Sequence, residues 1–234
     1  MWRIAFAPLL MLCALLSGRS QEGIGYEVLG KVLSARSEVF YLPEGEKDLR
    51  PVKVDSKLAT GTTVRTAEGA LLDAALIPGT LLHVSGDSEL KIEELKLTKN
   101  GNDTSEEMLN RRVRFRLKRG TVNVLFRCWN ENISQLTIVT KAATIRAEAG
   151  CLFQIQASDS RTRLVCARGK VYASAGSGEA TAIDEGHSQE WPSERSGAIA
   201  AAGDSRGEAE LSETLEAERI LSELESQRVP GLPR

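Results

Sequence analysis

Short β-prone segments separated by turn residues recur over most of this chain, and they limit strongly what it can fold into. Between Tyr26 and about Trp191, apolar and β-branched runs alternate with Gly, Pro, Asp, Asn and Ser at intervals of roughly eight to twelve residues. This pattern predicts an all-β fold of many short strands, arranged as a sandwich or a solenoid-like stack. The expected strands are 28–33, 38–42, 62–66, 70–77, 80–84, 90–97, 112–118, 122–126, 133–139, 144–148, 151–157, 162–167 and 170–174.

The clearest of these strands carries a row of basic residues. Along 112–118 the apolar side chains Val113, Phe115 and Leu117 alternate with four basic ones, which is the period of a half-buried strand. A turn is expected at Gly120, with a second strand beyond it. We take the basic row as the candidate ligand- or partner-binding site, formed by Arg112, Arg114, Arg116 and Lys118.

Two interpretations of this basic row are open from the sequence. It fits an acidic partner, a phosphate-bearing glycan of the cell envelope or the acidic tail of the same chain. Alternatively, it is a solvated strand face that prevents edge-to-edge pairing with another sheet.

Residues 1–20 have the layout of a secretory signal peptide. Arg3 precedes an apolar run from Ile4 to Leu16, and small or polar residues follow. As a helix this run would reach about 20 Å, which is short of the roughly 30 Å hydrocarbon core of a bilayer. Lipidation at Cys13 is an alternative. We therefore expect an exported protein, periplasmic or extracellular after cleavage, without an integral membrane span in the mature chain.

The C-terminal region differs in composition from the β region. Residues 193–206 are rich in Ser, Gly and Ala and suggest a linker, and 207–228 predict an acidic helix rich in Glu and Leu. Its apolar residues do not form one stripe, because Leu211 and Leu215 point nearly opposite to Ile220 and Leu224. The helix is thus either solvated or a docking element for a partner.

Residues 21–192 form the expected β domain, and its motifs resemble the FecR family. Four blocks in order carry the resemblance, over about residues 54–174: LATGTTVRTAEGALLDAALIPGT, RVRFRLKRGTVNV, IVTKAATIRAEAGCLFQI and LVCARGKVYAS. Each block is a strand, a glycine-containing turn and another strand. Glycine suits such turns because it adopts positive φ without steric cost.

The resemblance implies a sensing role, since FecR proteins carry a periplasmic β-rich domain that relays signals from outer-membrane transporters to anti-sigma machinery. Those sensors have a cytoplasmic segment and a membrane span ahead of this domain, where the present chain has the expected signal peptide. The resemblance therefore implies a standalone exported version of the domain. It assigns no binding residue, because the shared motifs are structural.

The sequence shows no recognisable catalytic or metal-binding motif. His83 and His187 lack the spacing of metal ligands, and there is no phosphate-binding loop or nucleophile elbow. The formal net charge of −2 gives no bias toward nucleic acid. We predict a protein that is not an enzyme and that uses no cofactor, metal or nucleic acid.

Cys151 and Cys166 are a possible disulfide pair. If Ser158 and Asp159 form a two-residue hairpin turn, Ile155 faces Thr162 and the two cysteines come directly opposite each other. A cross-strand bridge is then possible in an oxidising compartment. The alternative is two reduced, buried thiols.

Together these features predict an extracytoplasmic binding or sensing module of the bacterial cell envelope that recognises a protein or glycan. The alternative is a structural scaffold or assembly subunit that docks through its C-terminal helix.

Overall fold

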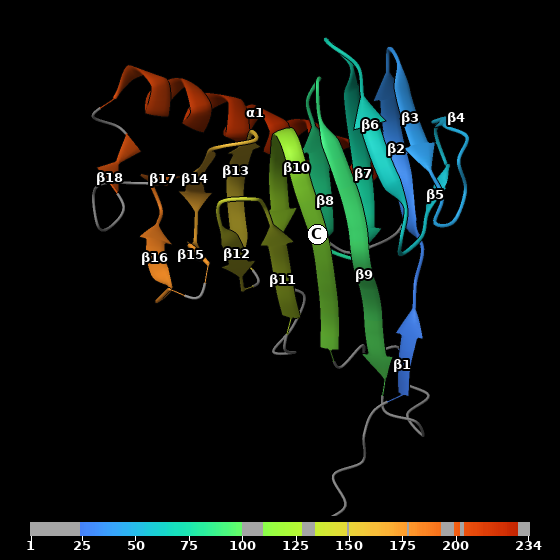
Figure 1. Cartoon of the computed structure of the whole chain (residues 1–234), viewed down its shortest axis with the longest axis horizontal. Helices are drawn as coiled ribbons and strands as arrows, with labels where there is room; N and C mark the ends of the chain where they lie inside the picture. The colour runs from blue at the N-terminus through green and yellow to red at the C-terminus, as the bar shows by residue number, and fades with distance from the viewer. Residues whose placement is uncertain are drawn as a thin grey trace, which may run out of the picture.

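The computed structural model describes residues 24–99, 110–127, 134–148, 150–176, 178–192, 199–201 and 204–228. The expected signal peptide and Cys128 lie outside these residues. Within them, the chain is mostly β-strand and ends in one long helix, which confirms the predicted fold class (Figure 1).

The strands form two facing sheets. The first, sheet A, contains in spatial order β4 (Arg50–Pro51), β3 (Val39–Leu42), β6 (Thr63–Thr66), β9 (Glu89–Lys99), β10 (Asn110–Phe126), β11 (Ser134–Val139), β12 (Thr144–Ala147), β15 (Lys170–Ser174) and β16 (Thr181–Asp184), with β1 (Ile24–Glu27) paired to the far end of β9. Sheet B contains β5 (Lys57–Leu58), β2 (Gly30–Arg36), β7 (Leu71–Ile77), β8 (Thr80–Val84), β10, β13 (Cys151–Ala157), β14 (Thr162–Arg168), β17 (His187–Trp191) and β18 (Ile199–Ala200).

Strand β10 belongs to both sheets and joins them. Its first part pairs with β9 and β11 in sheet A, and from Gly120 onward it pairs with β8 and β13 in sheet B. The turn predicted at Gly120 is therefore wrong: the strand bends there and continues. Gly120 has a φ of 99°, and a Cβ at this position would collide with Ser88. Only glycine satisfies both conditions.

The order of strands explains why both sandwich and solenoid features were expected. The chain passes between the sheets every one or two strands and moves steadily from the β2 end of the molecule to the β18 end. The pairing of β10 with β11 is parallel, and the other pairings are antiparallel. The result is a two-sheet sandwich that the chain builds progressively along its length.

The main hydrophobic core lies between the two sheets. Phe115 and Ile138 of sheet A and Phe126 and Phe153 of sheet B are fully buried in it. Val113, Phe115 and Leu117 are 0% exposed, as the alternation along 112–118 predicted. The inward residues alternate with outward polar ones, which is the pattern of a sheet with one face on the core.

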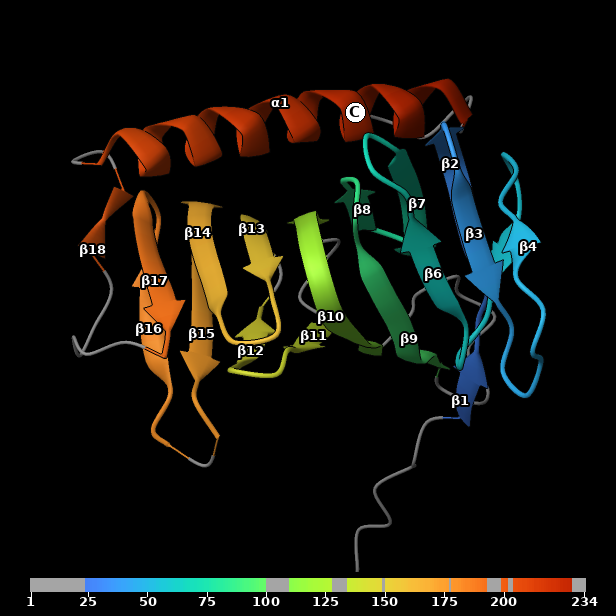
Figure 2. The same cartoon turned by 45° about the horizontal axis from the view of Figure 1, so that its top comes forward.

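Helix α1 (Ser205–Arg228) covers the outer face of sheet B (Figure 2). At about 1.5 Å per residue its 24 residues reach about 36 Å, close to the width of seven strand spacings of about 4.8 Å. It therefore crosses the sheet from the β17–β18 end to the β2–β7 end. Leu221 packs into a second apolar cluster with Leu33, Leu81, Leu125 and Leu152 of sheet B.

The buried positions of α1 are mostly small or polar, and for this reason no apolar stripe was visible in the sequence. They recur at heptad-like spacing and comprise Gly207, Glu210, Thr214, Ala217 and Leu221. Leu215 is 47% exposed on another side of the helix. The helix starts slightly before the expected residue 207, and the short strand β18 lies within the stretch expected to be a linker.

Candidate functional site

The basic row predicted from the sequence lies on the outer face of sheet A, which α1 leaves uncovered (Figure 2). Arg112, Arg114, Arg116 and Lys118 point outward from β10, with side chains that are 59%, 45%, 47% and 63% exposed. Because β10 has a partner strand on each side here, the row does not guard a sheet edge. The edge-protection interpretation is therefore wrong.

Three of the four predicted basic residues form ion pairs with carboxylates of the neighbouring strand β9. Arg114 and Arg116 each donate through Nε to Glu93, at 2.7 Å in both cases. Lys118 Nζ lies 3.2 Å from Glu89. These cross-strand ion pairs hold the charges within the sheet face.

The two neighbouring arginines change the pKa of Glu93. Partial burial acts to raise its pKa, but the hydrogen bonds and charges of Arg114 and Arg116 outweigh burial and lower the pKa below its usual value. Glu93 thus stays ionised at neutral pH and keeps both arginines in place.

Beyond β10, the same face holds a groove that the sequence did not predict. The outer groove has a volume of about 620 Å³, and its polar lining includes Arg112, Gln135, Thr137, Arg146 and Tyr172. Cross-strand pairing creates it, because Arg114 is opposite Thr137, Thr137 is opposite Arg146, and Arg146 is opposite Tyr172. A smaller hollow of about 260 Å³ shares Arg112 and Gln135 with it.

The polar groups of the outer groove are largely free for a ligand. In the part of the chain that the structure describes, Arg146 makes no hydrogen bond or ion pair, and it is exposed. Arg112 has one long contact, at 3.6 Å from Glu94. Of the three arginines that line the groove, Arg114 is paired with Glu93 and Arg112 lies near Glu94, so Arg146 is the one without an ion pair among the described residues.

Arg111 begins the basic segment but is buried. It is 4% exposed, and its guanidinium donates to the carbonyl oxygens of Pro78 and Arg127 and to Ser134 Oγ. It also lies 5.7 Å from the ring centroid of Phe126. Arg111 therefore stabilises one end of the sandwich and is not part of the exposed row.

Cys151 and Cys166 are free and buried thiols. The predicted hairpin register is wrong, since the loop at 158–161 is longer than two residues and places Ile155 opposite Leu164 and Phe153 opposite Cys166. Burial and the nearby Cys151 raise the pKa of Cys166 to about 12. Burial also raises the pKa of Cys151.

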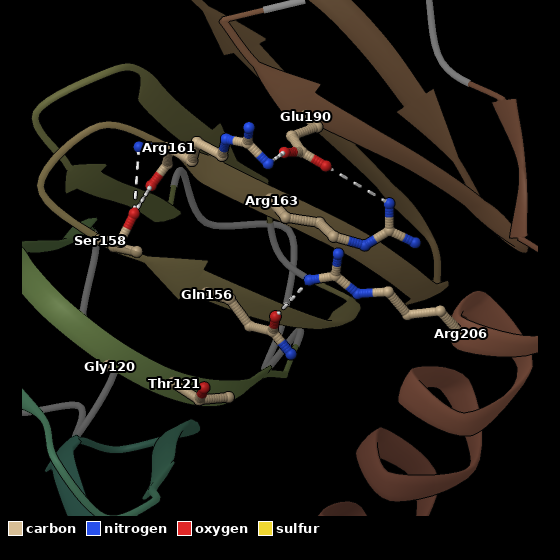
Figure 3. Close-up of a pocket in the computed structure, with 9 residues that line it drawn as sticks. Gly120, Thr121, Gln156, Ser158, Arg161, Arg163, Glu190 and Arg206 are labelled. Carbon is tan, nitrogen blue, oxygen red and sulfur yellow. Dashed lines mark hydrogen bonds and ion pairs between the residues drawn. The ribbon is translucent and has the colours of Figure 1, made fainter.

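A second cleft, of about 300 Å³, lies where the start of α1 meets sheet B (Figure 3). Figure 3 shows Arg161, Arg163 and Arg206 around it, with Glu190 near Arg161 and Arg163. Arg163 Nε donates to Glu210 at 2.8 Å, and their side chains are 9% and 6% exposed.

Two arginines of this second cleft, Arg163 and Arg206, attach α1 to the sheet. Arg206 of α1 donates to Gln156 of β13 at 2.9 Å and also to Glu210. Further along the helix, Arg127 is paired with Glu225 at 2.6 Å, and Arg168 with Glu218. The acidic helix thus binds basic residues of its own chain, but these are not the predicted row on β10.

His83 is paired with a carboxylate and buried beneath the helix side of sheet B. Its Nδ1 lies 2.7 Å from Asp73 Oδ1, and their side chains are 8% and 1% exposed.

In the described ranges, no three His, Cys, Asp or Glu side chains form a group suited to a metal ion. The described part of the chain contains no helix that is long and apolar enough to cross a membrane.

The structure defines a two-sheet β domain with one helix-covered face and one open polar face. The model of the FecR protein family matches residues 62–172, which confirms over these residues the resemblance that the motifs indicated. The family is regulatory in kind.

Solved structures with a partly similar fold include two of a Parabacteroides distasonis protein described as an anti-sigma factor, with TM-scores of 0.42 and 0.41. Each is 14% identical, over 58% of this chain and 57% of that one. The chain thus spans little more than half the length of those structures. No curated protein matched.

Proposed function

We propose that this protein is an extracytoplasmic binding and sensing module of the bacterial cell envelope that recognises a protein or glycan through the outer face of sheet A. The observation that carries the proposal is the outer groove, which Arg112 and the unpaired Arg146 both line, on a face that the described helix leaves uncovered. The FecR match over residues 62–172 supports the sensing role.

The ion pairs around the groove indicate which residues of the basic row would contact the partner directly. Arg114, Arg116 and Lys118 are held by carboxylates of β9, so a partner would have to displace those contacts. Arg112 and Arg146 offer charge without that cost. Arg112 is therefore the predicted residue that we retain as a direct contact, with Arg146 added.

The proposal includes an exported location and no catalytic role. The signal-peptide layout of residues 1–20 supports export. The regulatory kind of the FecR family supports a binding role. The buried His83–Asp73 pair lies away from both open clefts, which supports a structural role for it.

A second candidate function is a scaffold that docks a subunit through α1. One observation favours it: Leu215 is 47% exposed on the outward side of the helix. The face of α1 that carries Gly207, Ala217 and Leu221 is buried against sheet B and is not available to such a subunit.

Site-specific photo-crosslinking in the native cell separates the two functions. A photoreactive residue replaces Gln135 in the outer groove, and in a matched variant it replaces Glu216 on the exposed side of α1. We expect a crosslinked envelope component at position 135 that disappears when Arg112 and Arg146 are both changed to Gln. Crosslinking at position 216 alone would contradict the proposal and support the scaffold function.

A further inference from the structure

The outer groove has a chemistry more specific than a basic surface. We propose that it binds an oligosaccharide that carries carboxylate groups, with Arg146 holding the carboxylate and Tyr172 contacting the sugar ring. This inference rests on the proposed function, since it names the ligand of the same face.

The groove offers one unpaired guanidinium to a ligand. Arg114 is held by Glu93 and Arg112 lies near Glu94, whereas Arg146 makes no ion pair in the described part of the chain. A planar guanidinium matches a carboxylate with two parallel hydrogen bonds. A carboxylate of the ligand would therefore give Arg146 the partner that it lacks within the described chain.

The other groups of the groove suit a sugar. Tyr172 is directly opposite Arg146 across β12 and β15, so an apolar ring surface lies beside the charged group. Gln135 and Thr137 lie on the other side and make no side-chain hydrogen bond in the described part of the chain. Their amide and hydroxyl groups can donate to and accept from sugar hydroxyls, as does the Tyr172 hydroxyl. The volume of about 620 Å³ is within the range of ligand sites, about 300–1,000 Å³.

An acidic peptide fits the same groove less well. The strands beneath it, β10, β11, β12 and β15, each pair on both sides, so a peptide finds no free strand edge to extend. Leu136 and Ala147 in the lining are only 1% and 4% exposed. These two side chains are therefore not available to contact the aromatic or aliphatic anchor that protein interfaces usually bury.

Calorimetric titration of the full chain with three probes tests the inference. The probes are a short galacturonic acid oligomer, a galactose oligomer of the same length, and an oligoglutamate of the same length. We expect the galacturonic acid oligomer to bind most tightly and to lose affinity as salt is added.

Variants assign the binding to the groove. Arg146→Gln removes the charge and should weaken binding of the acidic sugar by about tenfold or more, since a charge-assisted hydrogen bond is lost. Tyr172→Ala should weaken it by removing the ring. Gln135→Glu should weaken it further by adding a negative charge to the groove opposite Arg112. Arg36→Gln is the matched control, because Arg36 is another exposed arginine without an ion pair among the described residues, and it should bind as the unmodified chain does.

Two results would overturn the inference. If oligoglutamate binds as tightly as the acidic sugar with the same dependence on Arg146, the groove takes an acidic peptide, and recognition by sheet A still stands. If the acidic sugar does not bind, or binds equally well to Arg146→Gln, the ligand class is wrong. Crosslinking at position 135 then reports separately whether the proposed function fails with it.

Discussion

At the scale of single residues, Gly120 holds the two sheets together through a bend that other residues cannot make. Its φ is 99°, and a Cβ there would meet both the side chain and the backbone of Ser88. We expect Gly120→Ala to lower the free energy of unfolding by roughly 2–5 kcal/mol, from the left-handed backbone and from overpacking combined. Urea-induced unfolding measures this loss.

The control for this change is Gly186→Ala in the turn between β16 and β17. Gly186 also has a positive φ, 74°, but a Cβ there would meet no atom within 4 Å. Gly186→Ala should lower the free energy of unfolding by only about 1–2 kcal/mol, from the left-handed backbone conformation alone. Equal losses for the two variants would contradict the role given to the contact with Ser88.

The two buried thiols give a second prediction at this scale. Burial and the nearby Cys151 raise the pKa of Cys166 to about 12, so its reactive thiolate is scarce at neutral pH. We expect iodoacetamide to modify Cys151 and Cys166 slowly in the folded protein and rapidly in denaturant, without added reductant. A bridge between them, seen as modification only after reduction, would contradict the free-thiol state.

Glu93 makes stability depend on acid pH. Because its pKa in the folded state is lowered, it stabilises the fold above the ordinary value of 4.5, and that contribution is lost as the pH falls through the lowered pKa. Glu93→Gln should therefore be less stable than the unmodified chain at neutral pH, and the difference should shrink below about pH 4.5. Thermal unfolding at several pH values measures it, and a constant difference would contradict the ion pairs with Arg114 and Arg116.

At the scale of elements, the attachment of α1 depends on a few polar contacts. Leu221 is fully buried, which contributes about 1.5–3 kcal/mol, whereas most other buried positions of the helix are small or polar. The buried pair of Arg163 and Glu210 supplies a specific anchor near the start of the helix.

Breaking this buried pair should detach the start of α1. Glu210→Leu leaves the Arg163 guanidinium without its nearest carboxylate, and we expect a loss of about 3 kcal/mol in the free energy of unfolding. Hydrogen exchange of the first turns of α1 should rise. The double variant Arg163→Met with Glu210→Leu should recover most of the loss, because a well-packed apolar pair replaces a buried ion pair at little cost. A double variant as unstable as the single one would show that the loss does not come from leaving the Arg163 guanidinium unpaired.

The elements show where sequence periodicity is informative and where it is not. Alternation along 112–118 predicted the buried and exposed faces of β10 correctly, since both sides of a strand follow from a period of two. The continuation of β10 through Gly120 was not predicted, because a glycine signals positive φ but does not distinguish a turn from a bend. The face of α1 was missed because its contacts are made by Gly207, Glu210 and Thr214, which have no apolar signal.

The outer groove was not predicted, because it is formed by strand pairings that cannot be inferred from the local sequence. Arg146 and Tyr172 are outward residues of two strands that are separated in the chain by the hairpin of β13 and β14. A prediction based on consecutive hairpins would pair β12 with β13 instead. The basic row was visible in the sequence, whereas its partners Glu89 and Glu93 and the free Arg146 required the sheet order.

At the scale of the whole molecule, the outer faces of the two sheets differ in how far they are covered. Sheet B is covered by a helix of matching length, and sheet A presents a polar face with the outer groove. The family match over residues 62–172 includes β10, β11 and β12 and ends at Tyr172 in β15. Arg112, Arg146 and Tyr172 of the proposed recognition surface therefore lie within the residues that the FecR model matches.

The most direct test of this account is arginine footprinting with a guanidinium-specific reagent, with and without a native envelope fraction. We expect Arg146 to react quickly in the isolated protein and to be protected by the envelope fraction. Arg163, which is buried against α1, should react slowly in both states, and Arg219 on the exposed side of α1 should react quickly in both. Protection of Arg219 with no change at Arg146 would contradict recognition through sheet A and place the partner on the helix.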